Sequence, residues 1–173
     1  MEIPVYMLTM LLALALAPAG PQKPDTFTAQ IKLQGLYDEI GEAITHATPA
    51  AQGVETLRTV LYTPDWEFID ASGRHQSWQQ ASAASEATFH ATPFDAIRHA
   101  IQRLTLKGDE ATVVVKVTVE TDQSHVDAHA TQMPQFRDQT MTFRDTWVRS
   151  GDTWKMKSRE QVGKPETHAA ALY

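Results

Sequence analysis

The sequence predicts an α+β domain in which a curved antiparallel sheet packs on N-terminal helices. Three observations lead to this fold class. Apolar residues recur at helical spacing through the first half of the chain, and β-branched residues alternate with polar ones in the second half. Short turn sequences separate the later strands, so neighbouring strands are expected to pair in an antiparallel meander. Helices grouped before strands are typical of the α+β class, because the two kinds of element form separate layers.

Two helices are expected ahead of the first strand, and a third after it. Apolar residues at helical spacing between Thr26 and His46 predict the first helix, with Asp25 or Thr26 as its N-cap. A second, shorter pattern runs from Val54 to Leu61. The sequence Ser77-Trp78-Gln79-Gln80 fits a capping box, in which serine and glutamine satisfy each other's backbone donors. We expect an alanine-rich third helix to follow this box.

The strands begin near Trp66, where the apolar period changes from helical to alternating. Val113, Val115, Val117 and Val119 give the most regular strand of the chain. The segment from Ile97 to Leu106 fits a helix as well as a strand, and the strand would begin at about Arg98. We interpret it as a strand, because the turn at 107–110 would then pair it with the valine strand.

The last two predicted strands form a hairpin around the turn Ser150-Gly151-Asp152. Phe143, Asp145 and Trp147 share one face of its first strand. In the second strand, uniform alternation places Trp154, Met156, Ser158 and Glu160 on one face, and Lys155, Lys157 and Arg159 on the opposite, solvent-facing side. Closing the turn would then bring Asp145 and Glu160 to the same side of the hairpin.

Composition and charge exclude several classes of function. The chain has 173 residues, the size of one ordinary domain, and its 42% hydrophobic and 21% charged residues are typical of a globular protein. It contains no cysteine and no asparagine, which excludes disulfides, thiolate chemistry and N-linked glycosylation. The net charge is −6 and the basic residues are scattered, so no nucleic-acid partner is predicted.

The first 19 residues resemble a secretory signal peptide. The apolar run from Met7 to Ala17 is too short to cross a bilayer, which takes about 20 residues, and small residues suited to cleavage after Ala19 follow it. The segment before the run holds Glu2 and no basic residue, which leaves an uncleaved anchor or a misassigned start as the alternative. We expect a secreted or periplasmic protein without membrane contact after cleavage, in which residues 20–25 form a linker.

Three segments together resemble the SnoaL-like domains of the nuclear-transport-factor-2-like superfamily. The hairpin from Thr142 to Met156 is similar to the terminal hairpin of these domains. The segments from Trp66 to Gly73 and from Gly108 to Val113 resemble the first strand and the turn before a central strand. The ordered set covers residues 26–163, and we expect a flexible tail over 164–173. The resemblance implies a cone-shaped α+β fold with an internal pocket, but the family includes isomerases, dehydratases, hydrolases, binding modules and oligomerisation domains.

Asp145 and Glu160 are the candidate catalytic residues. Each is expected on an otherwise apolar strand face, and a carboxylic acid in an apolar interior has a raised pKa, which suits acid–base catalysis. The alternative is that each carboxylate is paired with an arginine, a tryptophan N–H or the backbone. Tyr37, Trp66 and Trp147 are the candidate ligand-binding residues, since aromatic walls are typical of ligand pockets. Plain core packing is the alternative for them.

The segment His125-Val126-Asp127-Ala128-His129 has the only spacing suited to a metal. Its polar surroundings favour a solvated loop, so we predict neither a metal nor a cofactor. Three functions remain. The first is an exported domain that binds a small apolar or amphipathic molecule. The second is an isomerase, dehydratase or hydrolase that uses a pocket carboxylate. The third is an interaction domain that forms a homodimer through its sheet.

Overall fold

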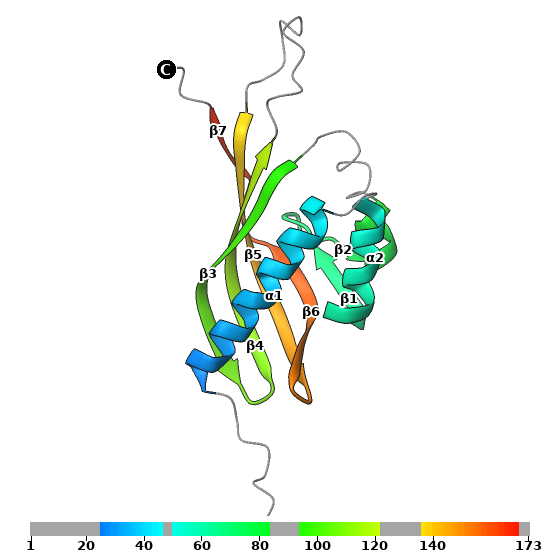
Figure 1. The fold of residues 1–173 in the computed structure, drawn as a ribbon, viewed down its shortest axis with the longest axis vertical. Coiled ribbons are helices and arrows are strands. Elements are labelled where there is room, and N and C mark those ends of the chain that lie inside the picture. Colours follow the sequence, from blue (N-terminus) through cyan, green and yellow to red (C-terminus); the bar gives the residue numbers. More distant parts are fainter. Residues whose placement is uncertain (1–24, 47–49, 84–93, 122–135, 170–173) are drawn as a thin grey trace, which may run out of the picture.

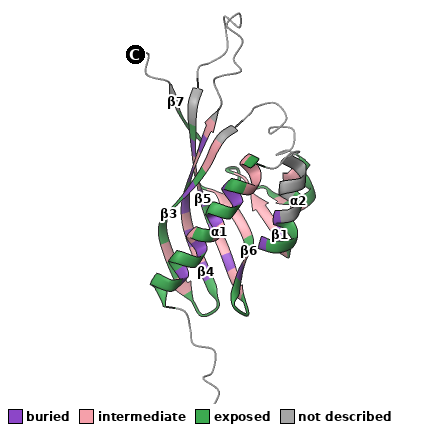
Figure 2. Cartoon of the chain, in the orientation of Figure 1, coloured by how far each residue is buried: buried purple, intermediate pink, exposed green. Residues whose placement is uncertain are grey.

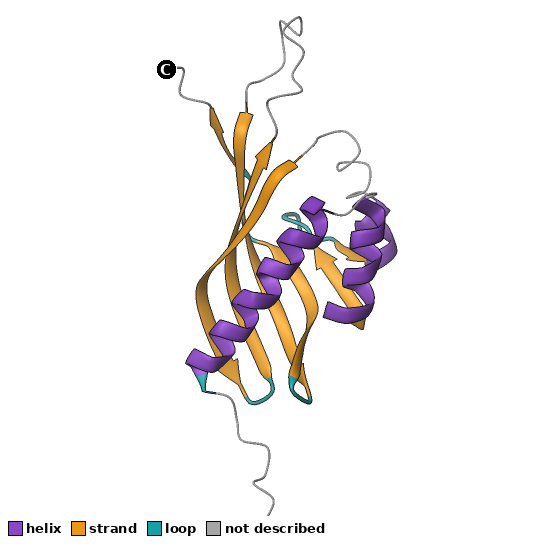
Figure 3. Ribbon diagram, viewed as in Figure 1, coloured by secondary structure: helices purple, strands orange, loops and turns teal. Residues whose placement is uncertain are grey.

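The fold consists of one curved sheet with helices packed on it. The computed structural model describes residues 25–46, 50–83, 94–121 and 136–169 of the chain. Helix α1 (Thr26–His46) crosses one face of the sheet, and α2 (Ala50–Leu61) packs beside it (Figure 1). The predicted signal peptide and the segment 125–129 lie outside the described residues. The helices and the strands form separate layers (Figure 3). The helices α1 and α2 come first along the chain and most of the strands lie in its second half, which confirms the α+β class.

The sheet has seven strands, and one of their pairings joins distant parts of the chain. The strands are β1 (Tyr62–Ile69), β2 (His75–Ser77), β3 (Phe94–Lys107), β4 (Glu110–Thr121), β5 (Phe136–Ser150), β6 (Thr153–Gln161) and β7 (Glu166–Ala169). Their order is β2-β1-β6-β5-β4-β3, and β7 pairs with the first part of β5. Strands β1 and β6 run parallel while the other pairs are antiparallel, so the sheet is mixed rather than wholly antiparallel as expected.

Two short strands were not expected from the sequence. Strand β2 is three residues long, and β7 falls in the segment for which we expected a flexible tail. Strand β2 leads directly into a helix that starts at Trp78, and the backbone N–H of Ser77 donates to Gln80 Oε1 at 2.9 Å. This bond is one half of the expected capping box.

Helix α1 begins at an aspartate cap and buries one stripe against the sheet. Asp25 Oδ1 accepts a hydrogen bond from the backbone N–H of Thr28 at 2.8 Å, which decides between the two expected N-caps. The residues buried by the helix follow its period: Ala29, Leu33, Tyr37, Ile40 and Gly41. This buried stripe faces the sheet, whereas the opposite side of the helix is exposed (Figure 2). Among the described residues, no helix has the length and apolarity needed to span a bilayer.

Gly41 allows α1 to approach β3 closely. A Cβ atom at this position would lie 2.4 Å from the backbone oxygen of Ile97, closer than real Cβ atoms come to other atoms. It would also lie 3.7 Å from Nδ1 of His99. The missing side chain therefore sets how near the helix lies to the sheet at this point.

A β-bulge changes the faces of β6 relative to the prediction. Trp147 pairs with Met156, but the preceding residue Thr146 pairs with Ser158, so Lys157 is an extra residue on β6. Beyond the bulge the alternation is reversed. Arg159 faces Asp145 on the interior side, and Glu160 lies on the outer side opposite Arg144. The expectation that Asp145 and Glu160 share a face is therefore wrong.

Candidate functional site

Asp145 is the centre of a buried polar network. Its side chain has no exposed surface. Arg159 donates to both carboxylate oxygens, from Nε at 3.0 Å and from Nη2 at 2.8 Å. The hydroxyl of Tyr37 donates to Oδ2 at 2.7 Å, and Nε1 of Trp147 donates to the Tyr37 oxygen at 2.9 Å. The network links α1 to the last two long strands of the sheet.

Charge and burial keep the phenol of Tyr37 neutral and the guanidinium of Arg159 charged. Burial, and next the Asp145 carboxylate, raise the pKa of the Tyr37 phenol well above its usual value, so the phenol stays a hydrogen-bond donor. Burial alone would lower the pKa of Arg159, but the charge and hydrogen bonds of Asp145 outweigh it and the pKa is raised. Arg159 therefore stays cationic, and the Asp145 carboxylate is neutralised by it.

A cavity of about 400 Å³ lies beside the network. Its floor is the sheet, and residues of α1, α2 and the helix after β2 complete its wall. Tyr62, Trp66 and Trp78 form an aromatic cluster in that wall, with ring centroids 4.9–5.2 Å apart. Phe143 also lines the cavity, and the Arg159 guanidinium lies over its ring, 4.9 Å from the ring centroid. Such an apolar enclosure with a few polar groups is typical of small-molecule sites.

Two buried nitrogen atoms on side chains that line the cavity have no hydrogen-bond partner within the described part of the chain. They are Nε1 of Trp66 and Nδ1 of His99. Trp66 is 8% exposed and His99 is 7% exposed. Burial first, and then the nearby charge of Arg159, lower the pKa of His99 to about 3. The imidazole is therefore neutral, and its ring stacks on Tyr37 with centroids 5.3 Å apart.

The predicted site residues fall into three places. Trp66 lines the cavity. Asp145, Tyr37 and Trp147 form the buried network behind it. Glu160 lies away from both, because it accepts a hydrogen bond from Arg144 at 2.8 Å on the outer side of the sheet. The structure thus separates the two candidate catalytic carboxylates.

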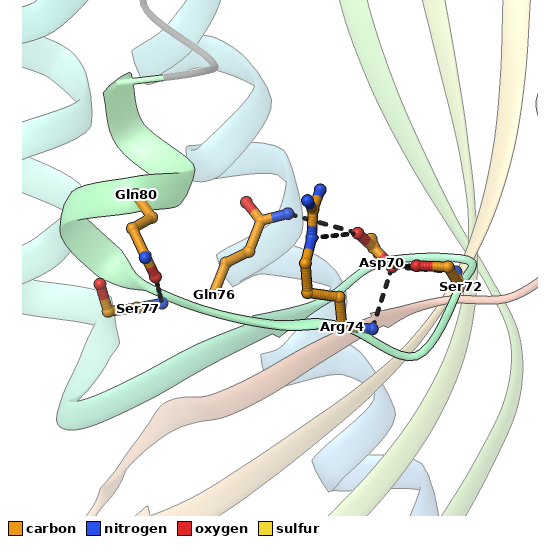
Figure 4. A network of polar contacts seen from close by, with 6 residues as sticks. All are labelled: Asp70, Ser72, Arg74, Gln76, Ser77 and Gln80. Atoms are coloured by element: carbon orange, nitrogen blue, oxygen red, sulfur yellow. Dashed lines mark hydrogen bonds and ion pairs between the residues drawn. The ribbon is translucent and has the colours of Figure 1, made fainter.

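Asp70 follows the last residue of β1 and belongs to the turn between β1 and β2. Its carboxylate accepts hydrogen bonds from the backbone N–H groups of Ser72 and Arg74 and from the Arg74 side chain (Figure 4). Gln76 Nε2 reaches the same carboxylate at 3.5 Å. These contacts stabilise the β1–β2 turn. They also satisfy the Asp70 carboxylate within the turn.

His99 and Arg159 line the cavity but were not singled out from the sequence. His99 follows Ile97 and precedes Ile101 at strand spacing, so its inward position could have been found once Arg98–Leu106 was read as a strand. Arg159 carries no such signal, because its inward position depends on the bulge at Lys157. In the described ranges, no group of three histidine, aspartate or glutamate residues is placed to hold a metal ion.

Comparison with known proteins identifies the fold. No family model matches the sequence, and no curated protein matches it. Among solved structures, the Kfla4162 protein from Kribbella flavida has a TM-score of 0.57 at 19% identity, over 82% of this chain and 95% of that one. A candidate scytalone dehydratase from Novosphingobium aromaticivorans has a TM-score of 0.56 at 16% identity, over 85% and 91%.

A nuclear-transport-factor-2-like protein of unknown function from Silicibacter pomeroyi has a TM-score of 0.51 at 14% identity, over 84% of this chain and 100% of that one. The chain therefore has the nuclear-transport-factor-2-like fold, as the resemblance in its sequence implied. At these identities the likeness establishes the fold alone.

Proposed function

We propose that the protein is a binding domain for a small apolar or amphipathic molecule, held in the cavity between the helices and the sheet. The observation that carries this proposal is the cavity of about 400 Å³, walled by aromatic rings and aliphatic side chains. The volume lies within the range of about 300–1,000 Å³ that is usual for ligand pockets.

The available acid–base groups favour binding over catalysis. Asp145 already accepts hydrogen bonds from Arg159 and Tyr37. His99 faces the cavity, but with its pKa lowered to about 3 by burial it is a weak base at neutral pH. Glu160 lies on the outer side of the sheet. An isomerase or dehydratase activity would need a stronger base in contact with the ligand.

The neutral, apolar fluorophore N-phenyl-1-naphthylamine tests the binding proposal. We expect it to bind saturably with an increase in fluorescence. Val117 is buried and lines the cavity, so Val117→Phe should fill part of the space and weaken binding about tenfold, or about 1.4 kcal/mol. Val114 lies on the opposite face of the same strand, and Val114→Phe is the matched control. Absence of saturable binding, or equal binding by both variants, would refute the proposal.

We also propose that the protein works outside the cytoplasm, as the apolar run from Met7 to Ala17 and the small residues after it indicate. N-terminal sequencing of protein recovered outside the cytoplasm should find a chain that begins at Gly20. Leu12→Arg places a charge in the apolar run and should retain the protein inside the cell. A cytosolic chain that begins at Met1 would contradict export.

A further inference from the structure

The edge of the sheet at β3 carries an exposed surface that lies apart from the cavity. Strand β3 is the last strand in the order of the sheet, and among the described strands only β4 pairs with it. We propose that the β3 edge from Arg103 to Lys107 binds an extended segment of a partner protein as an added strand. This segment has apolar residues on one face and acidic residues on the other. The surface shares no lining residue with the cavity, so the inference is independent of the proposed function.

Helix α1 covers the first half of the β3 edge. The side-chain amide of Gln34 donates from Nε2 to the backbone oxygen of His99 at 2.8 Å, and its Oε1 accepts from the backbone N–H of Ile101 at 3.4 Å. The amide thus engages backbone groups that a neighbouring strand would otherwise use. Further along the helix, Gly41 lies against Ile97. Helix α1 therefore runs opposite to β3, and its first turns lie beside the last residues of the strand (Figure 1).

The second half of the edge is open. The two-residue turn at 108–109 closes the β3–β4 hairpin, with Lys107 paired to Glu110. In such a hairpin the closing pair exchanges hydrogen bonds, and alternate residues of β3 direct their backbone groups toward β4. The N–H and C=O groups of Leu104 and Leu106 therefore point away from β4, and nothing in the described ranges bonds to them there.

Two exposed apolar side chains of α1 border this open half. Phe27 is 73% exposed and Ile31 is 57% exposed, and helical spacing places both on the same side of α1 as Gln34. On the adjoining inner face of β3, Leu104 and Leu106 are only half-buried. An added strand gains affinity from the free backbone groups, and its alternate side chains pack on such apolar neighbours. The open edge and the apolar border together fit an extended segment.

The charge of the open half determines the kind of partner. Its outer face carries Arg103 and Lys107, and neither forms an ion pair within the described part of the chain, although the net charge of the whole chain is −6. The stretch from 103 to 107 contains no acidic residue. Pairing the same stretch of two copies would bring cations together, and like charges on neighbouring strands are destabilising. A partner segment with acidic residues on its outer face is complementary instead.

A fluorescein-labelled hexapeptide in which valine and glutamate alternate tests the inference on the full chain. We expect a saturable increase in its fluorescence anisotropy. A hexapeptide with lysine in place of glutamate should bind about tenfold more weakly, because its charge is the same as that of the edge. Two isomers of the acidic peptide carry N-methyl groups on the valines or on the glutamates. One isomer should lose binding and the other keep it, because a strand directs alternate N–H groups to one neighbour.

Four protein variants locate the binding surface. Ile31→Ala removes apolar surface and should weaken binding of the acidic hexapeptide about fivefold. Arg103→Glu should weaken it to a similar extent, about fivefold, by reversing the charge. Val60→Ala and Lys157→Glu are the matched controls, because both residues are exposed and lie on α2 and β6, away from the β3 edge. All four variants should bind N-phenyl-1-naphthylamine equally well, since none of these residues lines the cavity.

The possible contrary results are distinct. Absence of binding, equal binding of the acidic and basic peptides, or equal binding by all four variants would overturn the inference and leave the binding function of the cavity untouched. Loss of fluorophore binding alone would count against the cavity and not against the β3 edge. Sedimentation of the chain without peptide tests the other occupant. A dimer that dissociates in Ile31→Ala would show that a second copy covers the edge, and the inference would then be wrong.

Discussion

Asp145 and Glu160 each pair with an arginine at 2.8 Å, but the two ion pairs differ in their surroundings. Asp145 is fully buried and Arg159 is 14% exposed, whereas Arg144 and Glu160 are 49% and 37% exposed. Removing one partner of a buried pair leaves an uncompensated charge in the interior. When an exposed pair is broken, water solvates the remaining partner, so the free energy of unfolding changes little.

Asp145→Ala should therefore lower the free energy of unfolding by about 2–4 kcal/mol, because Arg159 loses its partner. Glu160→Ala is the control and should lower it by less than about 1 kcal/mol. Urea unfolding of both variants measures the difference. Equal losses would mean that Asp145 is not buried against Arg159 in solution.

The burial of Asp145 could be predicted from its neighbours, but the identity of its partners could not. Phe143 and Trp147 flank it at strand spacing, so one face had to hold all three side chains, and all three are buried. Tyr37 comes from a helix more than 100 residues away, and its contact depends on how α1 crosses the sheet. Sequence alternation carries no information about such a crossing.

At the scale of elements, strand periodicity predicts faces only while the alternation is unbroken. The residues Lys155 to Glu160 alternate without a visible interruption, so nothing local indicates the extra residue at Lys157. The bulge brings Arg159 inward to Asp145, and the buried carboxylate gives that arrangement a strong energetic reason. Bulges of this kind follow from tertiary contacts, and uniform alternation cannot reveal them.

The packing of α1 on β3 leads to a prediction about two glycines of one helix. Gly41→Ala should lower the free energy of unfolding by about 1–3 kcal/mol, because the new Cβ would lie 2.4 Å from a backbone oxygen of β3. Gly35 is exposed, and a Cβ there meets nothing within 4 Å. Gly35→Ala should therefore raise stability by about 0.5–1 kcal/mol, the difference in helix propensity. Chemical denaturation distinguishes the two, and opposite signs are the expected result.

At the scale of the whole molecule, the cavity depends on a pairing that the sequence does not signal. Strands β1 and β6 run parallel, with Phe68 beside Arg159, although some 90 residues separate them. The predicted hairpins follow from short turns, but a parallel pair has no turn to mark it. The sequence therefore predicted the fold class and the β3–β4 and β5–β6 hairpins. It did not predict how β1 closes one side of the pocket and brings Trp66 into its wall.

Acid stability of the whole chain should depend on His99, which the fold buries as a neutral imidazole. Its pKa is lowered by burial from 6.5 to about 3, so between these values the unfolded chain binds a proton that the folded chain does not. The contribution of His99 to stability is therefore greatest above the pKa of histidine in the unfolded chain. The free energy of unfolding falls as the pH decreases below about 6.5, by up to about 1.4 kcal/mol per pH unit. From pH 7 to 5, His99 should account for a loss of about 2 kcal/mol.

His99→Phe keeps a ring against Tyr37 and removes the titrating group, so its stability should fall about 2 kcal/mol less between pH 7 and 5 than that of the unmodified chain. His75→Gln is the control, because His75 is 63% exposed and this variant still contains His99. Carboxylates titrate mainly below about pH 4, which leaves this window to the histidines. Urea unfolding at pH 7, 6 and 5 measures the effect. The same acid loss in His99→Phe as in the unmodified chain would show that the imidazole is not buried in its neutral form.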